Sequence, residues 1–215
     1  MKTFVKFSGL TDRAWVEQVP QGGAAGFVVE VADSPNTLTV EAAARLAESV
    51  PGGTEVWAVT RDPTPELIHR LFDEVGVDRI QVFGQVPPGL EFLETHHIVP
   101  SVPIPPEGPA DPLPKVPRPE DHPILHLDAP GNPAALGSPN RPNWEVCRAL
   151  VDAHPGRKLV LCGGLEPGNV EMALLTVRPW GLDVSAGIES APGVKDPKRM
   201  AGFVEAVLRA EASLS

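Results

Sequence analysis

Short apolar runs alternate with amphipathic stretches along most of the chain. Runs such as Gly26–Glu30 and Glu55–Thr60 have the length and β-branched content of buried strands. Between them lie stretches with apolar residues at helical spacing, as in Val40–Val50, for which Thr39 supplies an N-cap. The pattern predicts eight strands, at residues 3–7, 26–30, 55–60, 79–82, 97–104, 124–128, 159–162 and 182–185.

The predicted helices follow these strands in a regular order. Thr64 and Pro65 open one helix, Gly76 ends it, and Asn143 caps another. The predicted helices cover residues 11–19, with Thr11 as the cap, then 40–50, 65–75, 87–94, 144–153, 167–178 and 197–208. After the fifth strand no helix is expected, because a proline-rich loop takes its place, with prolines at positions 105, 106, 109, 112 and 114.

Eight strands alternating with about seven helices imply parallel pairing through right-handed crossovers. The simplest closure is an α/β fold of the (β/α)8 TIM-barrel type, formed by a single domain over residues 1–215. The competing architecture is an open doubly wound sheet, which would be unusually wide for this length. We therefore favour the barrel.

Composition narrows the class of partner and the compartment. The chain has a formal net charge of −10 and a pI near 5.0 without a Lys/Arg cluster, which argues against nucleic-acid and membrane partners. No stretch approaches the roughly 20 apolar residues of a membrane span, and residues 1–7 lack the core of a signal peptide. Cys147 and Cys162 form neither a disulfide framework nor a metal-ligand spacing, so we expect a cytoplasmic protein.

The last two strands both end in small, glycine-containing loops. Such loops leave backbone N–H groups free for an anion, most plausibly a phosphate, although either loop alone is also typical of a simple turn. In a barrel, the loops after strands seven and eight often bind phosphate. The predicted phosphate-binding residues are Gly163, Gly164, Ser185, Ala186 and Gly187.

Two aspartates lie at or near strand ends. Asp128 ends the sixth strand, where partial desolvation would raise its pKa and make it a general acid; the alternative is an aspartate that caps a loop or helix. Asp183 lies inside the eighth strand and either points into the barrel mouth or satisfies a neighbouring backbone group.

Four further segments are informative as whole motifs, namely Lys6–Thr11, Leu125–Ala129, Cys162–Asn169 and Asp183–Lys195. Together they resemble the phosphoribosylanthranilate isomerase family. The resemblance covers the chain in order and is most specific from Gly163 to Lys195. It implies an Amadori rearrangement of N-(5-phosphoribosyl)anthranilate in tryptophan biosynthesis, with no cofactor or metal, with Asp128 as the acid and with backbone amides holding the phosphate. We expect a phosphorylated small-molecule substrate and a monomer or homodimer.

The sequence departs from the family pattern at four places around the expected substrate. Ser8 stands where the family has its catalytic cysteine base, and Asn36 stands where an arginine lies close to the anthranilate carboxylate. Phe83 replaces a histidine, and residues 136–139 replace a Gly-Gly-Thr-Gly loop. We list Ser8 and Asp128 as catalytic candidates, and Asn36, Phe83 and Asp183 as other substrate-binding candidates.

Three interpretations of function remain open at this point. One is a divergent working isomerase, in which another group, or water held by Ser8, is the base. The second is a paralogue that binds a phosphosugar but has lost or changed the isomerase chemistry. The third is a structural scaffold whose partner would contact the proline-rich segment 103–119.

Overall fold

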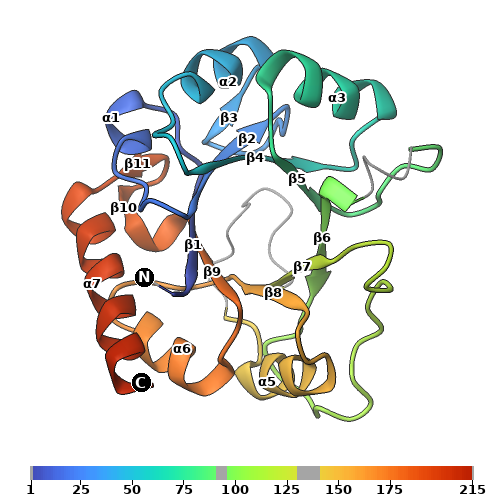
Figure 1. Cartoon of the computed structure of the whole chain (residues 1–215), viewed down its shortest axis with the longest axis vertical. Helices are drawn as coiled ribbons and strands as arrows, with labels where there is room; N and C mark the ends of the chain where they lie inside the picture. Colours follow the sequence, from blue (N-terminus) through green and yellow to red (C-terminus); the bar gives the residue numbers. More distant parts are fainter. Residues whose placement is uncertain (1, 91–95, 130–140, 215) are drawn as a thin grey trace.

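Eight parallel strands close into a barrel in the computed structural model, which describes residues 2–90, 96–129 and 141–214 (Figure 1). The strands pair in the order β1-β9-β8-β7-β6-β5-β4-β2, and parallel pairing of β1 with β2 closes the ring. This closure confirms the (β/α)8 prediction over the open sheet. The strands are β1 (Phe4–Ser8), β2 (Ala24–Val29), β4 (Glu55–Arg61), β5 (Arg79–Phe83), β6 (Ile98–Pro103), β7 (Ile124–Asp128), β8 (Lys158–Leu161) and β9 (Gly181–Val184).

Helices surround this ring (Figure 1), and no helix of the described ranges is long and apolar enough to cross a membrane. The predicted caps Thr39, Thr64 and Asn143 are confirmed, because each side chain accepts a hydrogen bond from the first turn. The helices are α1 (Arg13–Val16), α2 (Val40–Ala47), α3 (Pro65–Arg70) continued by the π-helical η1 (Leu71–Val75), α5 (Trp144–Ala153), α6 (Val170–Val177), η2 (Ala186–Ile188) and α7 (Pro197–Ser213).

Several helix predictions differ from the structure. The helix predicted at 40–50 ends at Ala47, the one at 167–178 begins at Val170, and the one at 197–208 continues to Ser213. The first helix is capped by Asp12 rather than Thr11, because the Asp12 carboxylate accepts a hydrogen bond from Ala14 N at 2.8 Å. It ends at Val16 rather than near Val19. Residues 87–90 of the helix predicted at 87–94 are not helical, and the rest of it lies outside the described residues. The short strands β3 (Thr37–Leu38), β10 (Glu189–Ala191) and β11 (Val194–Lys195) were not predicted, since two or three residues carry no readable period.

A proline-rich segment covers the barrel between β6 and β7. Residues 104–123 form no helix, as predicted, because closely spaced prolines remove the backbone donors that a helix needs. Leu113 and Val116 nevertheless pack against the core. The guanidinium of Arg157 donates to the carbonyls of Pro117 at 2.7 Å and His122 at 2.6 Å, which fixes the segment to the body of the barrel.

The interior of the barrel is divided into layers along its axis. The layer near the N-terminal ends of the strands is apolar and centres on the fully buried Trp57, whose indole donates to Glu55 at 2.6 Å. In the next layer toward the C-terminal ends of the strands, Lys6 of β1 points into the barrel. Gly26 of β2 leaves space for it, because a Cβ on Gly26 would lie 3.1 Å from Lys6 Cε. The apolar layer contains Phe4, Ala24, Trp57, Val99, Ile124 and Val160.

We expect Trp57→Ala to be strongly destabilising. The substitution removes the largest side chain of the apolar layer and leaves a cavity, so the free energy of unfolding should fall by about 3–5 kcal/mol. Chemical denaturation followed by circular dichroism measures this change. Val194→Ala, at a 46% exposed position, serves as the control and should cost less than about 0.5 kcal/mol. Equal effects of the two substitutions on the free energy of unfolding would contradict the placement of Trp57 in a buried apolar layer.

Candidate active site

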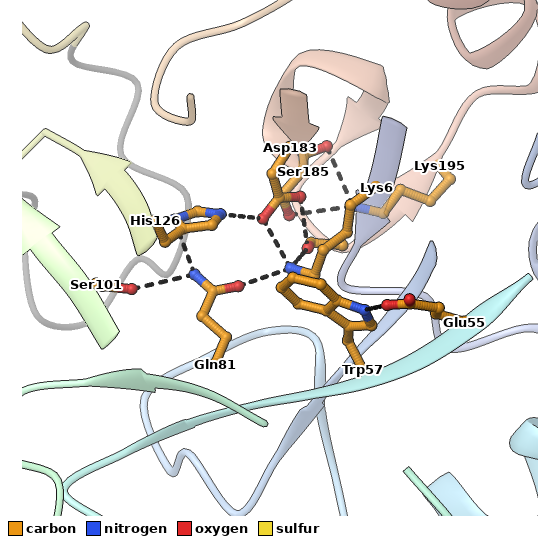
Figure 2. Close-up of polar contacts among 10 residues, drawn as sticks. Lys6, Glu55, Trp57, Gln81, Ser101, His126, Asp183, Ser185 and Lys195 are labelled. Carbon is orange, nitrogen blue, oxygen red and sulfur yellow. Dashed lines mark hydrogen bonds and ion pairs between the residues drawn. The ribbon is translucent and has the colours of Figure 1, made fainter. Parts of the chain in front are cut away.

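A buried lysine lies at the centre of the polar layer (Figure 2). Lys6 is 0% exposed, and its Nζ donates to Ser8 Oγ at 2.6 Å, Gln81 Oε1 at 2.6 Å and Asp183 Oδ2 at 2.7 Å. An ammonium has three protons, and these three acceptors use all of them. The buried charge is therefore fully compensated by one carboxylate and two neutral acceptors.

This lysine fixes the orientation of the side chains across the barrel. Because Lys6 can only donate, the Gln81 oxygen must face it, and the Gln81 amide nitrogen then faces Ser101 Oγ at 3.2 Å and His126 Nδ1 at 3.1 Å. His126 Nδ1 therefore accepts a hydrogen bond from the Gln81 amide. The remaining imidazole proton is on Nε2, which donates to Asp183 Oδ2 at 2.8 Å.

Asp183 receives three hydrogen bonds inside the barrel. Lys6 and His126 bind Oδ2, and the Ser8 hydroxyl donates to Oδ1 at 2.7 Å. Burial alone would raise the pKa of Asp183, but the Lys6 charge and the His126 hydrogen bond outweigh it and hold this pKa below its usual range. Asp183 therefore remains a carboxylate at neutral pH and points into the mouth, the first of the two orientations considered from sequence.

The hydroxyl of Ser8 is hydrogen-bonded to two charged neighbours. It accepts from Lys6 and donates to Asp183, and the side chain is nearly buried. Its proton is thus directed at a carboxylate whose pKa is depressed, which is a poor proton acceptor. Ser8 itself lacks the partner that a serine needs to become a base or nucleophile.

Asp128, at the end of β7, lies in a different electrostatic environment. Burial raises the pKa of its carboxyl to about 6, and the charge of Asp183 adds to the rise, whereas His126 and the Cys162 thiol oppose it. Its Oδ1 is buried and has no hydrogen-bond partner among the described residues. A carboxyl in this state holds its proton until near-neutral pH and can donate it.

The two glycine-containing loops line one cavity of about 660 Å³. Gly163 and Gly164 both have positive φ, which turns the chain sharply after β8. Gly187 lies directly against the Leu165 carbonyl, so any side chain at that position would separate the two loops. Asn169 fixes the first loop through bonds to Gly164 O and Glu166 N. All five predicted phosphate residues, Gly163, Gly164, Ser185, Ala186 and Gly187, line this cavity together with Asp183.

Phe83 and Asn36 lie in different surroundings. Phe83 lines a small cavity of about 20 Å³ together with Ser8, Asp183 and Ser185. Asn36 lies apart from it, packed against Gly9, and its amide donates to Glu189 Oε1 at 3.2 Å. The predicted change in loop six, at residues 136–139, lies outside the described residues.

Lys195 secures the loop that follows β9. Its Nζ bonds Glu189 at 2.7 Å and the Ser185 carbonyl at 3.1 Å, and burial lowers its pKa. This contact holds Ser185 at the rim of the cavity (Figure 2).

One group of side chains has the composition of a metal site. His126, Cys162 and Asp183 offer ligand atoms within 4.8 Å of one another. The Lys6 ammonium, however, already lies 2.7 Å from the Asp183 oxygen and supplies the positive charge there. Burial also raises the pKa of the Cys162 thiol well above its usual value, so it remains a thiol rather than a thiolate ligand. At this group of side chains, the Lys6 ammonium therefore occupies the position of a metal cation.

Sequence reasoning did not single out Lys6, Gln81 or His126. Each stands two positions before a predicted mouth residue, namely Ser8, Phe83 and Asp128. Side chains two apart on a strand share a face, so this period was a usable signal. Arg141 and Arg199, which line the large cavity, were also not among the predicted site residues. The two arginines lie outside the strands, where no such period exists.

The protein is a (β/α)8 barrel whose last two strands are followed by a candidate anion-binding cavity. The buried carboxyl of Asp128 lies at the same end of the barrel. Within this class of barrel, residues 5–206 match the family N-(5'phosphoribosyl)anthranilate (PRA) isomerase. The chain belongs to this family, the phosphoribosylanthranilate isomerases of tryptophan biosynthesis.

Individual relatives agree with this assignment along the whole chain. The N-(5'-phosphoribosyl)anthranilate isomerase of Nitrobacter hamburgensis is 33% identical over 100% of this chain and 96% of its own. Monomers derived from the dimeric enzyme of Thermotoga maritima superpose with a TM-score of 0.75 at 25% identity, over 96% and 99% of the two chains. A phosphoribosylanthranilate isomerase in complex with reduced 1-(o-carboxyphenylamino)-1-deoxyribulose 5-phosphate superposes with a TM-score of 0.72 at 25% identity and the same coverage.

We expect Lys6→Met to destabilise the barrel by about 3–5 kcal/mol, because it leaves the Asp183 charge buried without its partner. Adding Asp183→Asn should restore part of this loss, since the uncompensated charge is then gone. Urea denaturation of both variants measures the effect. Arg13→Met breaks an exposed ion pair with Glu17 and is the control, expected to cost less than about 1 kcal/mol. A Lys6→Met cost as small as that of the control would show that the pair is not needed.

Proposed function

We propose that this chain catalyses the Amadori rearrangement of N-(5'-phosphoribosyl)anthranilate, with Asp128 as the general acid. The observation that carries the proposal is the Asp128 carboxyl itself, which is buried, has a pKa of about 6 and has one oxygen without a partner among the described residues. The acid donates its proton to the ribose ring oxygen as the bond from that oxygen to C1 breaks. A pKa near the working pH suits such an acid.

The large cavity supports binding of the substrate's phosphate. Loops with positive φ at Gly163 and Gly164 leave backbone N–H groups available to an anion. The relative solved with a reduced product analogue carries a 5-phosphate ligand in the same barrel type. We therefore propose a phosphorylated sugar as the ligand. The oligomeric state, a monomer or homodimer, stays a prediction that light scattering would decide.

The proton acceptor at C2 is the unusual part of this site. Ser8 donates its own proton to Asp183 and is not a base. The cavity of about 20 Å³ beside Ser8, Asp183 and Ser185 has room for one water. We propose that a water there takes the C2 proton and passes it to solvent, from which Asp128 regains the proton that it donated. Water is a weak base, so turnover should be slow.

A second candidate function follows from the same observation. Because the Ser8 hydroxyl already accepts from Lys6 and donates to Asp183, the chain could bind the phosphosugar without rearranging it. In that case a pentose 5-phosphate raises the melting temperature, yet the anthranilate fluorescence of added substrate does not fall. The two candidate functions thus predict the same binding of the phosphosugar and differ only in whether the substrate is turned over.

We expect kcat/KM to fall about tenfold per pH unit above pH 6, because the acid works only while protonated and the pKa of Asp128 is about 6. Asp128→Asn should lower kcat/KM at neutral pH by about 10²-fold or more and remove this limb of the profile. Loss of substrate fluorescence measures both effects. Asp152→Asn, on the exposed face of α5, is the control and should leave the rate unchanged. Full activity of Asp128→Asn would exclude Asp128 as the acid.

We expect Ser8→Cys to raise kcat/KM by about 10²-fold or more. A thiol at this position would lie beside the Lys6 ammonium, now 2.6 Å from Ser8 Oγ, which favours the thiolate, and beside the Asp183 carboxylate at 2.7 Å, which opposes it. A thiol still ionises far more readily than a hydroxyl and is therefore the stronger base at neutral pH. Ser213→Cys adds an exposed thiol near the end of α7 and controls for nonspecific effects. If neither the natural chain nor a folded Ser8→Cys variant turns over substrate, the isomerase proposal fails.

A further inference from the structure

An arginine at the end of β4 faces the barrel mouth. Arg61 pairs with Phe83 in the parallel register of β4 and β5, just as Val59 pairs with Gln81. The side chains of Val59, Gln81 and Phe83 all line the same small cavity inside the mouth. Residues paired across parallel strands share a face of the sheet, and so do residues two apart on one strand. Arg61 therefore points into the mouth as well.

The positive charge of Arg61 is available to a ligand. Within the described part of the chain its guanidinium forms no hydrogen bond or ion pair, although the side chain is only partly exposed. Two nearby carboxylates are engaged elsewhere. Asp62 accepts from Gln85 N at 2.7 Å, and Glu30, which follows β2, pairs with Arg70 of α3 at 3.5 Å. In a chain with a net charge of −10, a partly buried arginine without a carboxylate partner favours an anionic ligand.

The β4 wall lies across the mouth from the glycine-containing loops. In the closed ring, β4 is four strands away from β8 in either direction, so the two strands are opposite each other (Figure 1). Gly163 and Gly164 follow β8, and Arg61 ends β4. Ser8, at the end of β1, and Asp128, at the end of β7, lie on the two sides between them. A ligand that extends from the glycine-containing loops across the mouth therefore reaches the β4 wall.

The surface beside Arg61 suits an aromatic ring. Val28, Val31 and Val59 form a buried apolar cluster against which Phe83 packs. Val28, Val59 and Phe83 also line the cavity of about 20 Å³ inside the mouth. Arg61 lies at the edge of this apolar surface, because Phe83 is its partner in the strand register. A planar carboxylate on an aromatic ring matches an apolar surface that has one guanidinium at its edge.

The substrate of the proposed reaction carries its second anion on the aryl group, at the end of the molecule away from the 5-phosphate. Asn36 has no charge, and its amide is already bonded to Glu189. Lys6 and Lys195 are already paired with carboxylates. We infer that Arg61 is the specificity-determining residue that binds the aryl carboxylate, with the aryl ring packed on the apolar surface beside it. This inference rests on the proposed function for its ligand.

A matched pair of ligands tests the assignment by titration calorimetry on the full chain. One ligand is reduced 1-(o-carboxyphenylamino)-1-deoxyribulose 5-phosphate, and the other is the same molecule without the carboxyl group. Arg61→Met should weaken the first ligand by about 10- to 100-fold and leave the second unaffected. Arg61→Lys should recover only part of the loss, because an ammonium lacks the forked geometry of a guanidinium. Arg45→Met removes the same charge from an exposed position of α2 and should change neither affinity.

Other binding patterns would overturn the inference. Equal weakening of both ligands by Arg61→Met would assign this residue to the phosphate or to the fold, and unchanged binding of both would remove it from the site. If either pattern appears while the natural chain turns over substrate, the inference fails and the proposed function stands. If the natural chain binds neither ligand, both fail. If the expected pattern appears without any turnover, the inference stands and only the proposed isomerase activity is lost. Circular dichroism of each variant confirms that it is folded.

Discussion

The ion pair between Lys6 and Asp183 is the constraint on which the rest of the site depends. A charged pair inside a barrel is stable only if every remaining donor and acceptor is also satisfied. Lys6 meets this requirement with three acceptors, and Asp183 meets it with three donors. The orientation of Gln81, the tautomer of His126 and the direction of the Ser8 proton all follow from it.

The same pair separates the properties of the two aspartates. Asp183 lies next to a cation, and its pKa is depressed, whereas Asp128 has no such neighbour and its burial raises the pKa to about 6. The negative charge of Asp183 also contributes to the rise at Asp128. Two carboxyl groups at one barrel mouth thus differ in pKa, so that near pH 6 a large fraction of Asp128 is still protonated while Asp183 is ionised. This is the arrangement expected where one group must act as an acid.

The sequence predicts the fold better than it predicts the site, for physical reasons. The strand period, the caps at Thr39, Thr64 and Asn143, and the prolines after β6 are local signals, so the barrel and its missing fifth helix could be derived from them. The partnership of Lys6 with Asp183 joins residues 177 apart, and nothing local to either one indicates it. Asp128 was found because it ends a strand, but its raised pKa depends on neighbours that only the closed barrel supplies.

Serine at position 8 suits the hydrogen-bond network of Lys6 and Asp183 better than it suits the role of a base. A hydroxyl both accepts and donates strong hydrogen bonds, so it can bridge the Lys6 ammonium and the Asp183 carboxylate at 2.6 and 2.7 Å. A thiol donates and accepts only weakly and would leave the buried charges less well solvated, although it would be the better base. Stability of the polar layer and strength of the base therefore favour different residues at this one position. The chain has serine, the residue that stabilises the layer. Such a trade-off between stability and activity is expected where a reactive group must lie between buried charges.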